Sequence, residues 1–359
     1  MRKGYLLLIL ASSLIFGGAG CISFSGGSSG AVGPVGFFIS SDKGDNWKSI
    51  SLMPTAAGVQ SLAGVSVYGL IEDPQDSNGL YWLTRGTGMY YSYDGGAGWK
   101  ITAPPLSSGF IYGLAIHPEN KCALFATNGR QIFKSDDCNR SWLEMYREAD
   151  NTDQLNSVAI NPFSPFEIYI TKAGGDMLRS EDSGQSWQLA HRFNANVVKI
   201  VFDTLEKDLV YAITRDNGFL RSKDGGKTWV DLGANLSAYT GALEYRRFYL
   251  NPRKAGQIYW ISKFGILMSR NFGADWEAIN LITPPGSVSI YSFAVNPLNE
   301  REIYYTATVN NLSTFYRSMD GGKNWVTRKL PSDQLPITLR VNPDNTNLLY
   351  LGFTTMPKN

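Results

Sequence analysis

Short apolar segments separated by turn residues recur along most of the chain, in the pattern of β-strands. In each unit an apolar run precedes a turn of the Asn-Pro type, and a run rich in aromatic and β-branched residues follows it. Runs of about four to eight such residues, bounded by Asn, Asp, Gly or Pro, predict β-hairpins. Seven segments follow the pattern: 70–84, 114–127, 158–171, 200–214, 248–262, 293–306 and 339–353.

A second motif, Ser-x-Asp-x-Gly-x-x-Trp, lies between these hairpins and also occurs seven times. Two copies depart from the pattern, with Asn139 in the place of Gly and Asn271 in the place of Asp. Neighbouring copies end 42 to 52 residues apart, a spacing typical of repeat architectures. The copies end at Trp47, Trp99, Trp142, Trp187, Trp229, Trp276 and Trp325.

Each repeat predicts four strands, of which A and B flank the Asn-Pro turn, C leads into the second motif and D begins at its Trp. The sequence therefore predicts an all-β fold, a single seven-bladed β-propeller of four-stranded antiparallel blades. The chain starts with a C–D half and ends with an A–B half. Only a ring lets the two halves complete one blade, so we expect N-terminal strands to pair with C-terminal ones and the propeller to span 37–355.

The residues of the second motif suit a tight turn between strands C and D. Asp and Ser side chains accept backbone N–H groups in such turns, Gly supplies a positive φ, and Trp packs its ring while its N–H finds a carbonyl. A catalytic site is not built seven times, so we interpret the motif as structural. Its third position is held by Asp42, Asp94, Asp137, Asp182, Asp224, Asn271 and Asp320.

The seven motifs resemble the Asp-box, or BNR repeat, and the resemblance covers nearly all of the chain beyond its N-terminus. The Asp-box family includes sialidases, sortilin-type receptors, xyloglucan-cleaving endoglucanases and photosystem II assembly factors. The resemblance implies the propeller fold and leaves function open. In plan the chain is similar to the sortilin-type and assembly-factor propellers, and the latter bind a partner protein, use a basic patch and include lipoproteins.

The N-terminus has the pattern of a signal peptide. Arg2 and Lys3 precede an apolar stretch that is short for a membrane span, and small residues end it at Cys21. This resembles a bacterial lipoprotein signal, although Gly18 stands where that family usually has Leu. We expect a signal peptide at 1–20, lipidation of Cys21 and a Gly/Ser tether at 21–36, with ordinary cleavage near Ala19 or a retained anchor as alternatives. The predicted location is an exported one, anchored to a bacterial membrane and facing the periplasm or the cell exterior.

Export also bears on the other two cysteines, Cys122 and Cys138. The blade topology places both at one end of a single blade, the first beside strand B and the second in the C–D turn. Neighbouring turns can approach to disulfide distance in an oxidising compartment, so we predict a Cys122–Cys138 bond. The alternative is two buried free thiols.

Composition argues against some partners. The formal net charge is only +2, which gives no support to a nucleic-acid ligand. No metal-binding cluster, phosphate-binding loop or Ser-His-Asp arrangement is apparent, so we expect no cofactor and no metal. We expect a monomer whose partners are a protein or glycan and, through the lipid, a membrane.

The B–C and D–A loops share one end of a propeller, here called the loop face, and the A–B and C–D turns share the other, here called the turn face. Variable loops on a rigid scaffold carry function, so we look for a ligand on the loop face. Five blades offer a cation just beyond strand B, and aromatic or basic residues recur at the start of strand A. These candidate binding residues are Arg85, Arg130, Lys172, Arg215, Lys263, Tyr112, Arg246 and Tyr291.

Two interpretations of these cations remain open. A ring of cations focuses a positive potential and binds an anionic or acidic partner, whereas solvated charges only limit aggregation. A third possibility is a glycoside hydrolase of the sialidase or xyloglucanase type on the same face. That reaction needs two carboxylates across the scissile bond, and no pairing of Asp176, Asp216 and Glu244 is specified. The binding or assembly scaffold is the preferred function, with no catalytic residue assigned.

Overall fold

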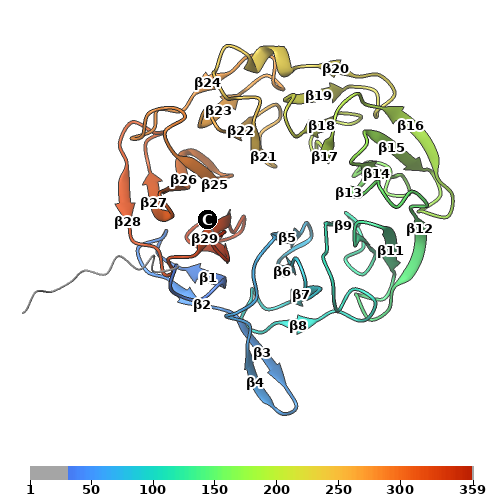
Figure 1. Ribbon diagram of the computed structural model, residues 1–359, viewed down its shortest axis with the longest axis horizontal. Coiled ribbons are helices and arrows are strands. Elements are labelled where there is room, and N and C mark those ends of the chain that lie inside the picture. The colour runs from blue at the N-terminus through green and yellow to red at the C-terminus, as the bar shows by residue number, and fades with distance from the viewer. Residues whose placement is uncertain (1–30, 358–359) are drawn as a thin grey trace, which may run out of the picture. The chain divides into compact units, whose positions relative to one another are not determined.

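The computed structural model describes residues 31–357, which form a ring of seven four-stranded antiparallel sheets (Figure 1). The predicted fold class is confirmed. The predicted signal peptide and Cys21 lie outside the described residues. No helix within 31–357 is long and apolar enough to cross a membrane.

The blades are numbered from the first sheet that is continuous in sequence. Blade 1 contains β5 (Gly69–Asp73), β6 (Asp76–Leu83), β7 (Met89–Ser92) and β8 (Lys100–Ile101). Blade 2 contains β9 (Gly113–Ile116), β10 (Leu124–Thr127), β11 (Gln131–Ser135) and β12 (Leu143–Arg147). Blade 3 contains β13 (Leu155–Ile160), β14 (Ile168–Lys172), β15 (Asp176–Ser180) and β16 (Gln188–Arg192). Blade 4 contains β17 (Val197–Phe202), β18 (Val210–Thr214), β19 (Phe219–Ser222) and β20 (Val230–Asp231).

The remaining blades include the one that closes the ring. Blade 5 contains β21 (Tyr245–Leu250), β22 (Ile258–Ser262), β23 (Ile266–Ser269) and β24 (Glu277–Ala278), preceded by the short 3₁₀ helix η1 (Gly233–Leu236). Blade 6 contains β25 (Ser289–Asn296), β26 (Asn299–Val309), β27 (Leu312–Ser318) and β28 (Val326–Arg328). Blade 7 contains β29 (Leu335–Val341), β30 (Leu349–Thr354), β1 (Gly36–Ser40) and β2 (Lys48–Ser49).

Ring closure follows the predicted pairing of the two chain ends. Strand β1 pairs antiparallel with β30, with Phe38 opposite Leu351. The last residues of the predicted tether are also engaged, because Val35 is buried and its N–H donates to the carbonyl of Ala63 at 2.9 Å. The end of that segment is therefore packed against the propeller and is not free chain.

The core lies between the blades. Strand B of each blade is sandwiched by its neighbours, and β18 and β22 are buried along their whole length. Such strands read as continuous apolar runs because both of their faces are covered. The outermost D strands are short and exposed, as in β20 and β24. Strand A lies innermost in every blade and surrounds the ring axis (Figure 1).

The seven Ser-x-Asp turns share one hydrogen-bond pattern. In the first, the Ser40 hydroxyl donates to Asp42 Oδ1 at 2.7 Å and accepts the N–H of Gly44 at 2.8 Å. Asp42 Oδ1 also accepts the N–H of Asn46 at 2.8 Å. The equivalent three bonds recur in the other six turns. These side chains are therefore occupied by the turns that they form.

The two departures from the motif have local explanations. Asn139 adopts a φ of 69°, in the left-handed region that Asn tolerates better than most residues, and its Oδ1 accepts the indole N–H of Trp142 at 3.1 Å. Asn271 replaces one of the two carboxylate oxygens with an NH₂ group that donates to Asp275 Oδ2 at 2.7 Å, while its Oδ1 still accepts the N–H of Asp275 at 2.8 Å. In the other turns the position of Asp275 carries Asn, Gly, Ser or Thr, so blade 5 exchanges the acid between the two positions.

The tryptophans of the motif divide into three groups. The indole N–H of Trp142 donates to side-chain oxygens, those of Thr102 at 3.0 Å and Asn139 at 3.1 Å. The indole N–H reaches a backbone carbonyl in four blades, for example from Trp99 to Ile50 at 2.6 Å. Within the described residues, the indole nitrogens of Trp47 and Trp276 have no hydrogen-bond partner. Packing of the ring is the role that these two share with the others, as in the edge-to-face contact of Trp276 with Phe219 at 5.8 Å.

Two further features lie at the turn face and at the rim of the propeller. Cys122 and Cys138 are paired as a disulfide at the turn face of blade 2, with their Cα atoms 3.7 Å apart. A hairpin that the repeat does not predict, β3 (Leu52–Thr55) with β4 (Gly58–Ser61), projects from the rim between blades 7 and 1 (Figure 1). It accounts for the longest gap between motifs, that from Trp47 to Trp99.

Candidate functional site

Two loop-face arginines lie over aromatic rings. The guanidinium carbon of Arg85, just beyond β6, is 5.5 Å from the ring centroid of Tyr68 and 5.8 Å from that of Phe110. Phe110 stacks on Tyr112, with ring centroids 3.7 Å apart. Arg85 itself is exposed. A cation over an aromatic face that remains open to solvent is available for a ligand.

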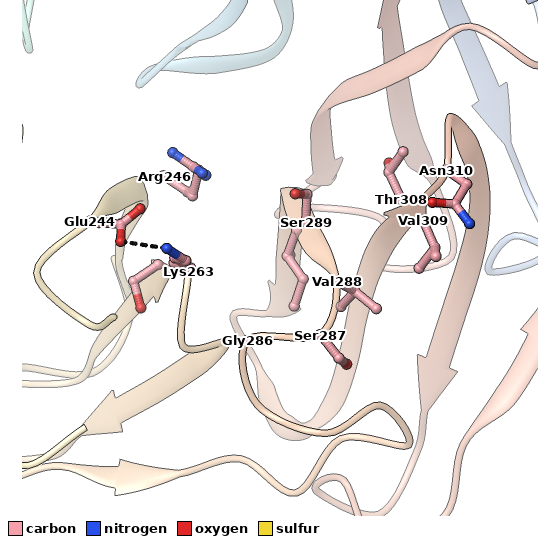
Figure 2. A pocket seen from close by; sticks show the side chains of 12 residues that line it. Glu244, Arg246, Lys263, Gly286, Ser287, Val288, Ser289, Thr308, Val309 and Asn310 are labelled. Carbon is pink, nitrogen blue, oxygen red and sulfur yellow. Dashed lines mark hydrogen bonds and ion pairs between the residues drawn. The ribbon is translucent and has the colours of Figure 1, made fainter. Parts of the chain in front are cut away.

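The second such pair lies at the start of strands A in blades 5 and 6. The guanidinium carbon of Arg246 is 5.8 Å from the ring centroid of Tyr291. Arg246 lines a pocket of about 350 Å³ between these blades. Figure 2 shows Glu244 and Lys263 on one side of the pocket, and Thr308 and Asn310 of the β26–β27 hairpin on the other.

The charges of cations from three blades act on one phenol at the loop face, that of Tyr68. Burial raises the pKa of Tyr68 above its usual range, and the positive charges of Arg247, Arg85 and Arg215 oppose the rise. Arg215 is exposed just beyond β18. Within residues 31–357, no carboxylate lies within 4.0 Å of Arg85, Arg215 or Arg246. These three side chains are therefore not held in ion pairs within the described residues.

Lys172 differs from the free cation that its position in the repeat predicts. Its Nζ lies 3.0 Å from Glu148, 3.5 Å from Asp153 and 4.0 Å from Asp176. Burial alone would lower the pKa of Lys172, but the hydrogen bond and charge of Glu148 and the charge of Asp153 raise it. The group is a cation enclosed by acids and adds no positive potential to the face.

Arg130 and Lys263 are also occupied. The guanidinium of Arg130 donates to the carbonyls of Asp150 at 2.6 Å and Asp153 at 2.9 Å, and so holds the loop before β13. Lys263 forms an ion pair with Glu244 at 2.9 Å. The even ring of five cations is thus replaced by an uneven arrangement in which Arg85 and Arg215 keep free charge and Arg246 joins them.

Sequence reasoning missed Phe110 and Arg247 at this site. Phe110 lies in the loop before β9, outside the repeat positions that we compared. Arg247 follows Arg246, but its guanidinium turns toward the ring axis and donates to the carbonyl of Ile337 at 2.8 Å. The acids of residues 148–153 were the available signal that Lys172 and Arg130 have partners.

Two of the three candidate loop-face carboxylates are engaged with cations, whereas Asp216 is exposed and forms no ion pair within the described residues. Asp176 contacts Arg192 at 3.3 Å as well as Lys172, and Glu244 contacts Lys263. Burial alone would raise the pKa of Glu148, but hydrogen bonds from the Asp150 N–H, Lys172 and Tyr146 together lower it. A glycosidase acid needs the opposite shift, because it must hold a proton near neutral pH. Within the described residues, no group of three or more His, Cys, Asp or Glu side chains is placed to hold a metal.

The chain matches no family model. It is 24% identical over 197 residues to an oligoxyloglucan-reducing end-specific xyloglucanase of Emericella nidulans, covering 48% of this chain and 24% of that protein. It is 22% identical over 251 residues to a xyloglucanase of Paenibacillus sp., covering 63% of this chain and 22% of that protein. The chain thus spans about a quarter of the length of these relatives.

Solved structures give the same picture of the fold. A GH74 enzyme of Niastella koreensis superposes with a TM-score of 0.63 at 16% identity, over 81% of this chain and 51% of that one. YCF48 bound to a D1 peptide superposes with a TM-score of 0.59 at 13% identity, over 84% of this chain and 95% of that one. At these identities the likeness shows the propeller fold alone.

Proposed function

We propose that this chain is an exported Asp-box lipoprotein whose propeller acts as a binding or assembly scaffold, with the loop face as its binding surface. The ligand is an acidic segment of a protein or an acidic glycan. The observation that carries the proposal is the group of three uncompensated arginines, Arg85, Arg215 and Arg246, two of which lie over aromatic rings.

The cations of the loop face are of two kinds, paired and unpaired. Cations that are already paired, such as Lys172, hold loops in place and leave little field outside the protein. Unpaired cations beside half-buried aromatic rings attract carboxylates and give the apolar neighbours of those carboxylates a surface to contact. The pocket beside Arg246 gives such a segment about 350 Å³ of space. The complex is expected to be salt-sensitive because Arg85 and Arg215 are exposed.

Similar proteins support a protein or glycan ligand and do not decide between the two. One propeller of similar fold and nearly equal length is described as bound to a D1 peptide, and other relatives are named xyloglucanases. Tethering through Cys21, after removal of residues 1–20, would hold the propeller at a bacterial membrane and leave the loop face open to an exported or membrane-bound partner.

A glycoside hydrolase on the same face is the second candidate, and the xyloglucanase relatives are the observation that favours it. The engaged carboxylates Asp176 and Glu244 argue against it. Incubation of the purified chain with xyloglucan oligosaccharides, followed by measurement of new reducing ends, tests this candidate. Release of reducing ends that is lost on Asp176→Asn or Glu244→Gln would establish it.

The scaffold is tested with labelled probes of defined charge. Glutamate-rich peptides, polygalacturonate and neutral xyloglucan oligosaccharides are titrated with the chain at low and high salt. We expect saturable, salt-sensitive binding of an acidic probe and weaker binding of the neutral one. Equal binding of neutral and acidic probes, or binding insensitive to salt, would contradict an arginine-based site.

A further inference from the structure

A second pocket, of about 280 Å³, lies on the ring axis and opens at the turn face. Strand A of five blades lines it, namely β5, β17, β21, β25 and β29. Its rim carries Pro252, Pro297 and Pro343, which belong to the A–B turns. It is therefore separate from the loop-face pocket beside Arg246, which lies at the other end of the same strands.

Cations from different sides of the ring enter this pocket. Lys199 on β17 and Arg340 on β29 both line it. Arg247 on β21 lies deeper in the axis, where its guanidinium donates to the carbonyls of Arg246 and Ile337, both at 2.8 Å. One carboxylate, that of Glu72, lies among the lining residues. Within the described residues, Lys199, Arg247 and Arg340 have no carboxylate within 4.0 Å.

The like charges perturb one another. Burial lowers the pKa of Lys199 to about 8, and the charges of Arg340 and Arg247 add to the shift. Burial raises the pKa of Glu72, and Arg340 opposes this. Lys199 is exposed to the axial channel, and Arg340 is half-buried. Like charges held close together repel one another, and an anion bound between them relieves that repulsion. Lys199, Arg340 and Glu72 are not part of the loop-face site.

We propose that the axial pocket binds a small ligand through a carboxylate or phosphate group, with Lys199 and Arg340 as its direct contacts. The volume limits the ligand to about the size of a phosphate or a single acidic sugar. The ring of Tyr249 forms part of the wall and is held edge-on by Tyr259 and Phe293, at 6.0 Å and 6.1 Å between centroids. An apolar wall beside two cations suits a compact organic anion.

The pocket has a defined pH dependence. Lys199 faces Arg340 from β29, Arg247 and Tyr249 from β21, and Glu72 from β5. The pKa of Lys199 is about 8, so in the empty pocket the group loses its proton as pH rises past that value. The pKa of Tyr249 is raised to about 12, first by burial, so its hydroxyl stays neutral over this range. Binding of an anion therefore weakens above pH 8.

The test uses D-glucuronate and inorganic phosphate as probes and glucose as a neutral control, measured by calorimetry and by thermal stabilisation of the full chain. We expect a Kd of roughly 1 mM or tighter for at least one anion. Lys199→Met and Arg340→Met should each weaken its binding about tenfold or more. The matched controls Lys207→Met and Arg140→Met remove exposed cations elsewhere on the turn face and should leave the affinity unchanged.

The outcomes are separable. Binding of glucuronate alone identifies a carboxylate ligand, and binding of phosphate alone identifies a phosphate ligand. Because Lys199→Met removes a repelled cation, the unliganded variant should melt no lower than the wild type, which shows that it folds. Absence of saturable anion binding by the wild type, equal binding of glucose, or unchanged affinity in both pocket variants would overturn the proposal. Arg85→Glu, at the loop face, should not affect this site.

Discussion

Lys172 Nζ lies 3.0 Å from Glu148 Oε2. This pair, together with Asp153, neutralises the loop face beside blade 3, while Arg85 and Arg215 keep uncompensated charge elsewhere on the same face. Position in the repeat is the same for Lys172 and Arg215, so their different roles come from the loop that packs against each. A cation at this position of the repeat is structural where carboxylates of a neighbouring loop pair with it, and it is available to a ligand where none does.

Removal of the Lys172 charge should destabilise the propeller. Both members of the pair are largely enclosed, with side-chain exposures of 14% and 5%, and Lys172→Met leaves Glu148 and Asp153 without a counter-charge. A loss of about 3 kcal/mol in the free energy of unfolding is expected from urea titration. The matched change Lys263→Met breaks a pair that is 55% and 45% exposed, and should cost less than about 1 kcal/mol. Equal losses of stability in the two variants would contradict the distinction between an enclosed structural pair at Lys172 and an exposed pair at Lys263.

The Ser-x-Asp turns should weaken in acid. The turn hydrogen bonds lower the pKa of Asp42, Asp137, Asp182, Asp224 and Asp320 from 3.8 to about 2. A depressed folded-state pKa contributes stability that is fully present above the unfolded value and is lost as pH falls through the folded value.

The urea midpoint should therefore fall between about pH 4 and pH 2 as these carboxylates take up protons. Asp182→Asn should reduce the size of that fall, because one titrating turn is removed. A midpoint that stays constant down to pH 2, or a fall unaffected by Asp182→Asn, would disagree with the lowered pKa values.

Blade 5 can be tested by compensating substitutions, because its turn carries the amide at position 271 and the acid at position 275, the reverse of the order in blade 6. Asn271→Asp places a second carboxylate beside Asp275, whose Oδ2 accepts from Asn271 at 2.7 Å. At low ionic strength we expect a loss of about 1 kcal/mol that salt reduces. The double variant Asn271→Asp/Asp275→Asn reproduces the arrangement of Asp320 with Asn324 in blade 6 and should recover the loss. If the double variant loses as much stability as the two single changes added together, the acid and the amide are not exchangeable between positions 271 and 275.

The disulfide should protect blade 2. Cys122 and Cys138 are 16 residues apart, and in the chain-entropy model closing such a loop stabilises by about 3 kcal/mol. The variant Cys122→Ser/Cys138→Ser should lose stability of that order, and native exported protein should gain alkylatable thiols only after reduction. Two thiols that react without a reductant would show that the bond does not form.

The fold could be predicted because seven repeats of a local motif carry it. Turn chemistry at Ser40 and Asp42 is local in sequence, and the phase of the repeat fixed the pairing of β1 with β30. The β3–β4 hairpin was not predicted, because it interrupts the repeat where no motif marks it.

The candidate site could be predicted only in part, because its electrostatics depend on contacts between distant segments. Arg130 reaches the carbonyl of Asp153, 23 residues away, and Arg247 reaches that of Ile337, 90 residues away. The repeat shows that a residue lies at the loop face, and it carries no information on which neighbour compensates its charge.

The most direct test of the account compares two triple charge reversals for binding of a glutamate-rich peptide by fluorescence anisotropy. Arg85→Glu/Arg215→Glu/Arg246→Glu alters the loop face, and Lys207→Glu/Lys227→Glu/Lys323→Glu makes the same change in net charge with exposed lysines of the turn face. We predict that the first variant loses affinity about tenfold or more at low salt, while the second stays close to wild type. Equal losses in the two variants, or none in the first, would contradict a binding site built on the loop-face arginines.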